Sequence, residues 1–126
     1  MIRQDCLGKL KTCHEDLQKL FDEVSKTRDF LVLYGFRNEN EQNSLWAQKK
    51  SKLKWPTSYH NQTPSMAVDV VPFPVPDWKN LKPFQDFMEF VKQTARELEI
   101  DIQCGGEWPR FRDYPHYQLK VANLKK

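Results

Sequence analysis

The sequence predicts an α+β domain with a small, mostly antiparallel sheet and helices packed on one side of it. Segments with helical spacing of apolar residues alternate with short apolar runs, in the order helix, helix, strand, helix, strand, helix, strand, strand. The 126 residues are enough to bury one hydrophobic core. A content of 39% hydrophobic and 29% charged residues is typical of a soluble globular protein. We therefore expect residues 1–126 to form a single domain.

Two helices are expected at the N-terminus. Residues 3–10 predict a short helix. Thr12 and Glu15 have the spacing of a capping box, which predicts a second helix start. The apolar residues that follow recur at i, i+3, i+4 and i+7, as in an amphipathic helix packed on a core; they are Leu17, Leu20, Phe21 and Val24.

A strand and a third helix come next. The apolar run 30–34 is rich in strand formers and ends at Gly35, which favours a buried strand. Asn38 and Glu41 repeat the capping spacing and predict a helix over 39–50.

The second strand is expected at 67–73, and it carries an acid. Asp69 is the only charge in this apolar run. A carboxylate buried in this way must be paired or bound to a cation, because leaving it bare costs several kcal/mol.

The last elements follow an extended, proline-rich connector with Pro72, Pro74 and Pro76. Residues 80–99 predict a long helix, whose apolar face is formed by Phe84, Phe87, Met88, Val91, Ala95 and Leu98. Residues 100–104 and 117–122 predict the two final strands, separated by a loop that contains Trp108.

Composition excludes several classes of protein. No run of 18 apolar residues exists, so no membrane insertion is expected. The first residues lack the pattern of a secretory signal, which predicts synthesis in a cytoplasm without export by that route. The three cysteines follow no disulfide framework and predict free thiols. The net charge of +3 is scattered among acids, which argues against a nucleic-acid partner.

Two segments carry candidate metal ligands. His60 precedes the strand that bears Asp69, and Asp113 lies three residues before His116. His60, Asp69 and His116 supply two imidazoles and one carboxylate, a three-ligand set that leaves a fourth position open in a catalytic zinc site. Asp113 would then lie near enough to take a proton from a water at the metal.

These residues also carry a resemblance to a family. Three motifs occur in the order of the zinc D-alanyl-D-alanine carboxypeptidase and L-alanyl-D-glutamate peptidase family, which includes VanY-type carboxypeptidases and bacteriophage endolysins. Ser-x-His-x-x-Gly-x-Ala-x-Asp resembles Ser58 to Asp69, and Gly-Tyr-Arg with Glu-Gln-Asn resembles Gly35 to Asn43. Gly-Gly-Asp-Trp followed by Phe-x-Asp-x-Pro-His-Phe resembles Gly105 to Tyr117, with Phe111 at the first Phe.

The resemblance implies a zinc peptidase catalytic domain over 1–126, with the hedgehog/D-Ala-D-Ala peptidase-like fold. It implies His60, Asp69 and His116 as zinc ligands and Asp113 as general base. Arg37 would lie near the substrate, where its guanidinium can bind a carboxylate or the developing oxyanion.

Two further positions complete the expected site. Ser58 would orient the His60 loop and border the substrate, and Trp108 would line the cleft. Two extra residues lie between His60 and Asp69, with Pro64 and Ser65 where the family has glycine, which predicts a longer turn with converging ligands.

The function expected from this resemblance is hydrolysis of the L-alanyl-D-glutamate bond of peptidoglycan stem peptides, as a monomeric phage endolysin. It would be made in the host cytoplasm and act on the wall after release. Three alternatives remain open. One is a D-alanyl-D-alanine carboxypeptidase, which shares the ligand set. The others are a cysteine peptidase built on Cys104 and a non-catalytic wall-binding module with a structural zinc.

Overall fold

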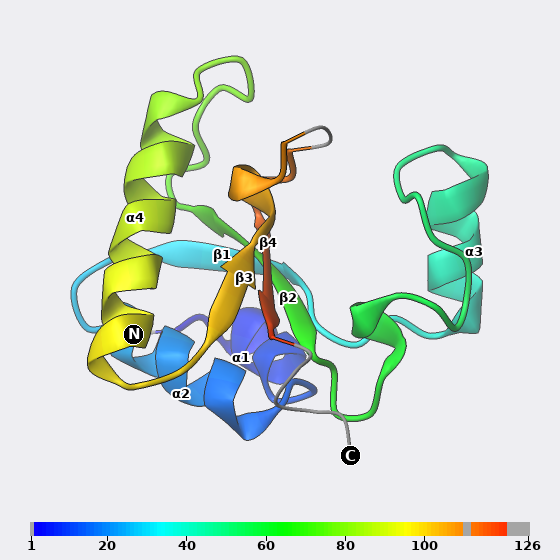
Figure 1. Ribbon diagram of the computed structural model, residues 1–126, viewed down its shortest axis with the longest axis horizontal. Helices are drawn as coiled ribbons and strands as arrows, with labels where there is room; N and C mark the ends of the chain where they lie inside the picture. The colour runs from blue at the N-terminus through cyan, green and yellow to red at the C-terminus, as the bar shows by residue number, and fades with distance from the viewer. Residues whose placement is uncertain (1, 110–111, 121–126) are drawn as a thin grey trace.

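A four-stranded antiparallel sheet runs through the molecule in the order β1-β2-β4-β3 (Figure 1). The computed structural model describes residues 2–109 and 112–120. The strands are β1 Phe30–Tyr34, β2 Ala67–Pro72, β3 Ile102–Cys104 and β4 His116–Leu119. The helices are α1 Gln4–Leu10, α2 Glu15–Val24, α3 Glu39–Ala47 and α4 Lys82–Glu97. The predicted class and order of elements are confirmed, and no helix in the described part of the chain is long and apolar enough to cross a membrane.

The core lies on the face of the sheet that α2 and α4 cover. Side chains alternate across a strand, so Tyr117 points into the core while its neighbour His116 points to the opposite face. The Phe21 ring of α2 lies 5.6 Å from the Phe30 ring and 5.5 Å from the Tyr117 ring in edge contacts. Phe87 of α4 contacts Phe30 from the other helix. The apolar faces of α2 and α4 therefore pack into one shared core.

The N-terminal helix α1 covers the free edge of the sheet at β1. The thiol Sγ of Cys6 accepts a hydrogen bond from the Val32 N–H at 3.3 Å. An edge N–H that would otherwise be open to pairing is thus satisfied. Cys6 and Leu10 are buried in the core.

The start of α2 differs from the predicted capping box. His14 is the N-cap, and its Nδ1 accepts a hydrogen bond from the Asp16 N–H. The Thr12 hydroxyl instead donates to the Lys9 carbonyl and accepts from the Phe36 N–H. Thr12 therefore joins α1 to the end of β1, and the prediction of Thr12 as a cap was wrong.

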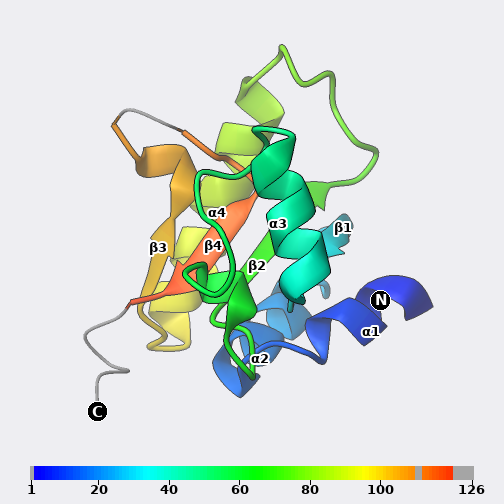
Figure 2. The same ribbon diagram turned by 90° about the vertical axis from the view of Figure 1, so that its right-hand side faces the viewer.

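Helix α3 stands apart from the other helices. In both views it lies on the side of the sheet opposite α4 (Figures 1 and 2). Only Gln42 of this helix is buried, and Trp46 is 43% exposed. With so few apolar side chains, α3 has nothing to bury in the core. The expected placement of helices on one side thus holds for α2 and α4 and fails for α3.

Several element boundaries differ from the predicted ones. The capping box of Asn38 and Glu41 is present, but α3 ends at Ala47 and Lys49 adopts a left-handed conformation with φ 63°. β3 begins at Ile102 because Ile100 still donates its N–H to the carbonyl of Ala95 in α4. β4 begins at His116, one residue before the predicted start. The end of that predicted strand, beyond Lys120, lies outside the described residues.

Candidate metal centre and active site

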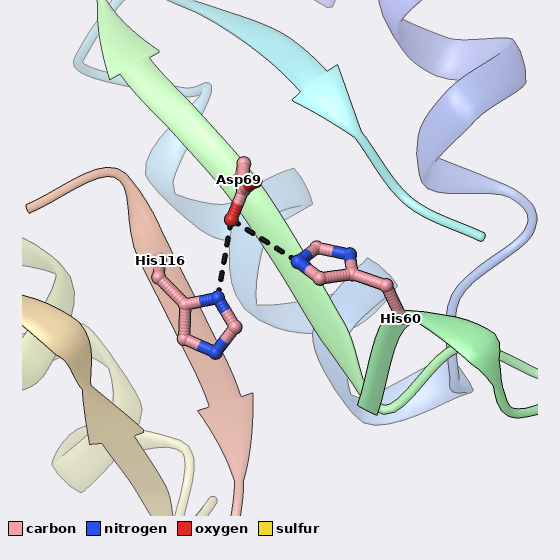
Figure 3. A group of neighbouring side chains, drawn as sticks. All are labelled: His60, Asp69 and His116. Atoms are coloured by element: carbon pink, nitrogen blue, oxygen red, sulfur yellow. Dashed lines mark hydrogen bonds and ion pairs between the residues drawn. The ribbon is translucent and has the colours of Figure 1, made fainter. Parts of the chain in front are cut away.

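Three predicted ligands converge on the face of the sheet opposite the core (Figure 3). Asp69 of β2 and His116 of β4 are directly paired across the two strands, so their side chains share one face. His60 comes from a short 3₁₀ turn, η1 Tyr59–Asn61, that precedes β2. Asp69 Oδ1 lies 3.2 Å from His60 Nε2 and 3.2 Å from His116 Nδ1. The longer turn between His60 and Asp69 leaves the three side chains together, as expected.

Hydrogen bonds on the far side of each imidazole fix its tautomer. His60 Nδ1 lies 2.8 Å from the Gly35 carbonyl, which can only accept, so this nitrogen carries the proton. His116 Nε2 lies 2.7 Å from the Gln118 Oε1, whose amide group donates to Gln103. In their neutral forms both rings therefore turn a lone pair toward Asp69.

The electrostatics of this group favour a cation. Burial acts to raise the pKa of Asp69, but the two imidazoles outweigh it and hold this pKa well below the ordinary range. Burial acts to lower the pKa of His116, but its hydrogen bond to Asp69 and the charge of that carboxylate raise it overall. The lowered pKa of Asp69 and the raised pKa of His116 have one cause, since a buried carboxylate between two imidazoles attracts positive charge.

The donor set fits a metal ion. One ligand atom from each of His60, Asp69 and His116 lies within 4.8 Å of the others, and all three side chains are buried. Two lone pairs and a carboxylate oxygen that face one another repel unless a proton or a cation lies between them. Two imidazoles and a carboxylate match a zinc site with one open position.

Close approach of the backbone at Gly35 supports this geometry. A Cβ there would overlap the Lys9 carbonyl oxygen and the Thr12 hydroxyl. Glycine thus lets the chain leave β1 close enough to α1 for its carbonyl to reach His60. This gives a physical role to the glycine of the Gly35-Phe36-Arg37 motif.

Arg37 contacts the carboxylate oxygen that the histidines leave free. Its Nη2 lies 2.8 Å from Asp69 Oδ2, and the residue is 8% exposed. Among the described residues Arg37 does not pair with the nearby surface acids Glu39 or Glu41. Arg37 therefore orients Asp69, and its predicted contact with substrate stays a prediction.

Gln42 is a site residue to which sequence analysis assigned no role. It is fully buried, and its Oε1 accepts hydrogen bonds from Arg37 Nη1 and Asn61 Nδ2, both at 3.2 Å. Its Nε2 donates to Ser51 Oγ at 2.9 Å and to the Leu53 carbonyl at 2.7 Å. One amide thus joins the arginine behind Asp69, the turn that bears His60 and the loop after α3. In the sequence, the importance of Gln42 was indicated by its position in the Glu41-Gln42-Asn43 motif.

Replacing Gln42 with Ala is expected to lower the free energy of unfolding by roughly 2–4 kcal/mol, because buried donors on Arg37 and Asn61 lose their acceptor. Chemical denaturation followed by circular dichroism measures the change. Gln48→Ala is the matched control, since Gln48 is exposed at the end of the same helix, and it should change stability by less than about 0.5 kcal/mol. Equal losses in the two variants would contradict the role given to Gln42.

Asp113 lies beside the three candidate ligands. Its backbone N–H donates to the Gly105 carbonyl, and its carbonyl accepts from the His116 N–H at 3.0 Å. A Cβ at Gly105 would overlap that Asp113 carbonyl oxygen, so the close approach requires glycine. Burial raises the pKa of Asp113, and the nearby Asp69 carboxylate raises it further. A raised pKa makes a carboxylate a stronger base.

The other predicted site residues lie around the same group. The Ser58 hydroxyl accepts a hydrogen bond from the His60 N–H at 3.1 Å, so it holds the η1 turn. The Trp108 ring is half-buried, and its centroid lies 5.1 Å from that of His116. Phe111, the first residue of its motif, lies outside the described residues.

Two depressions flank the candidate metal ligands and define the candidate active site. The main cleft, of about 760 Å³, has Asp69 and Arg112 in its lining and an apolar wall formed by Leu33, Leu45, Trp78, Leu81 and Phe84. The side pocket, of about 120 Å³, is lined by residues that include Ser58, His60, Trp108 and His116. Three residues line both depressions, namely Arg37, Lys50 and Asp113. A substrate chain can therefore pass the metal ligands with room on both sides.

Cys104 is not placed for nucleophilic catalysis. It pairs with Tyr117 across β3 and β4, and it is 1% exposed in the core. Burial raises the pKa of its thiol to about 12, so the reactive thiolate is absent near neutral pH. This geometry disfavours the cysteine-peptidase alternative.

A buried His-Asp-His group with a neighbouring acid, set in a cleft on one face of an α+β sheet, defines a candidate metal-dependent hydrolase. The family profile of the phage L-alanyl-D-glutamate peptidases matches residues 2–122. The chain belongs to this family.

Individual relatives agree with this assignment. The peptidoglycan L-alanyl-D-glutamate endopeptidase CwlK of Bacillus subtilis is 28% identical over 111 residues, which are 76% of this chain and 64% of CwlK. The match thus spans less than two thirds of CwlK. The L-alanyl-D-glutamate peptidase of Escherichia phage T5 is 28% identical over 89% of this chain and 83% of its own length.

A solved structure shares the fold. The L-Ala D-Glu endopeptidase ChiX of Serratia marcescens superposes with a TM-score of 0.81 at 28% identity. The match covers 94% of this chain and 89% of ChiX. The expected fold class is therefore confirmed.

Proposed function

We propose that this protein is a zinc-dependent peptidase that hydrolyses the L-alanyl-D-glutamate bond of peptidoglycan stem peptides. The observation that carries the proposal is the convergence of His60, Asp69 and His116, each held by a partner on its far side. Membership of the phage L-alanyl-D-glutamate peptidase family supports the choice of bond. Depressions on both sides of the ligands suit an enzyme that cuts within a peptide.

In the proposed mechanism the chain's own residues position the substrate and move one proton. A zinc ion held by the three ligands would lower the pKa of a bound water from about 15.7 to about 7 and polarise the scissile carbonyl. Asp113 would accept the proton of the attacking water and pass it to the leaving amine. Arg37 would keep Asp69 in place, and the Gly35 and Gln118 oxygens would hold the two imidazoles.

We further propose that residues 1–126 act as one catalytic domain and as a monomer, in the lysis of a bacterial host by a phage. The single core shared by the sheet, α2 and α4 supports one domain. The name of the phage T5 relative supports the phage role.

Digestion of purified peptidoglycan tests the proposed activity. We expect the protein to release new D-glutamyl amino termini, identified by mass spectrometry. A chelator should abolish the release, and added zinc should restore it, because the ligands would then regain their ion. Release of D-alanine instead would assign a carboxypeptidase, and cutting that resists the chelator would exclude metal-dependent catalysis. Binding to the wall with no cutting would favour the non-catalytic module.

A further inference from the structure

Lys50 is a cation that the two depressions of the candidate active site share. It is exposed and lines both the main cleft and the side pocket. Among residues 2–109 and 112–120, no carboxylate forms an ion pair with its ammonium group. An amine beside the metal ligands is therefore free to meet a negative group on a bound molecule.

The backbone around Lys50 is fixed on both sides. The N–H groups of Lys50 and Ser51 both donate to the Leu45 carbonyl, at 2.8 and 3.2 Å. The buried amide of Gln42 holds Ser51 Oγ and the Leu53 carbonyl. The same amide accepts a hydrogen bond from Arg37. The Gln42 side chain therefore holds both the segment that follows Lys50 and the arginine that contacts Asp69. The backbone at Lys50 is therefore already ordered, so only its side chain loses freedom when it binds a partner.

The lining of the main cleft suits an anionic peptide. Three cations, Arg37, Lys50 and Arg112, face two carboxylates, and one of these, Asp69, is already paired with Arg37. Arg112 does not line the side pocket that contains His60 and His116. Lys50 alone among these cations is both free of a carboxylate partner and common to both depressions. It is thus the best placed to meet a charge next to the bond that is cut.

The proposed substrate carries such a charge. In a stem peptide the D-glutamate continues through its side-chain carboxyl, so its α-carboxylate stays free, one carbon from the nitrogen of the scissile bond. We propose that Lys50 is a specificity-determining residue that pairs with this α-carboxylate. This inference rests on the proposed function and adds to it a preference for glutamate over its α-amide, isoglutamine. A primary ammonium binds a carboxylate more strongly than a neutral amide.

Two synthetic peptides test the inference. L-Ala-γ-D-Glu-L-Lys and the same peptide with an α-carboxamide differ only in the group that Lys50 would meet. The wild-type protein should cut the carboxylate peptide with a kcat/KM about tenfold higher, mostly through KM. Lys50→Gln should lose this preference and cut the amide peptide as the wild type does. Lys49→Gln is the matched control, with the same loss of charge at a neighbour that lines neither depression, and should keep the preference.

Binding of the product γ-D-Glu-L-Lys, measured by calorimetric titration, gives a second readout. Lys50→Gln should weaken it about tenfold and leave binding of the α-amide product unchanged. Cleavage of both peptides at equal rates, or a preference that survives in Lys50→Gln, would overturn the role of Lys50 and leave the proposed function standing. If neither these peptides nor peptidoglycan yielded D-glutamyl termini, the proposed function would fall, and the inference with it. If the protein cut peptidoglycan but neither synthetic peptide, the product titration would test the role of Lys50.

Discussion

Replacing Asp113 with Ala is expected to reduce kcat by roughly 10²–10⁴-fold while zinc stays bound, which is the range for loss of a general acid–base. The hydrogen bonds that Asp113 makes to Gly105 and His116 come from its backbone, so they survive the substitution. Its carboxylate is absent from the group of converging ligand atoms. The variant should therefore fold and hold metal, yet be unable to remove the proton from the attacking water.

Zinc content by atomic emission and single-turnover release of D-glutamyl termini measure the two properties separately. Asp113→Asn is the closest control, because it keeps the size of the side chain and removes the basic oxygen. It should be as inactive as the alanine variant and bind zinc as the wild type does. Loss of zinc from either variant would make Asp113 a structural residue, and full activity of Asp113→Asn would exclude it as the base.

The fold could be predicted from local patterns because the helices show apolar spacing or capping motifs and the strands are short apolar runs. The spacing of Leu17, Leu20 and Phe21 is enough to define the buried face of α2. The position of α3 could not be predicted in this way. This helix has few apolar side chains to bury, and no local sequence pattern indicates on which side of the sheet such a helix lies. Thr12 failed as a cap for a related reason, since its hydroxyl is used by Phe36 from a distant segment.

The convergence of the three candidate ligands was predictable from the sequence, and the groups that hold them were not. His60, Asp69 and His116 belong to motifs, and strand alternation is enough to put His116 opposite the core-facing Tyr117. Gln42 acts on segments distant in the sequence, whereas Gln118 acts on His116, two residues away in the same strand. Gln118 meets His116 because both lie on one face of β4, and Gln42 matters because a loop folds back over α3. The role of Gln42 therefore comes from long-range geometry, which a single sequence does not display.

The longer spacing between His60 and Asp69 shows how an insertion can be absorbed. Ser65 is fully buried, its N–H donates to the Thr12 carbonyl, and its carbonyl accepts from the His14 N–H. The turn is thereby tied to the segment between α1 and α2. Its extra length is taken up away from the candidate metal ligands, and His60 keeps its place beside Asp69.

Replacing His116 with Ala is expected to remove both metal and activity, because one of the three lone-pair donors disappears and the charge of Asp69 loses a partner. Loss of a residue that only orients a ligand typically costs roughly 10- to 100-fold in metal affinity. Loss of the ligand itself should exceed that range. Gln118→Ala removes the acceptor of the His116 Nε2 proton and an exposed hydrogen bond to Gln103, but no ligand, so it should fall within the range and retain activity at saturating zinc.

His14→Ala completes this series. His14 caps α2 and is not among the converging ligands in the described part of the chain, so it should cost about 1 kcal/mol of stability and no zinc. Zinc titration followed by the shift in melting temperature measures affinity without reference to catalysis, because an ion that binds only the folded state raises that temperature. The order His116→Ala, Gln118→Ala, His14→Ala, from largest to smallest loss of affinity, is what a His-Asp-His metal centre requires. A His116→Ala variant that bound zinc and cut peptidoglycan as the wild type does would end the zinc proposal, since the two remaining ligands cannot form the site described here.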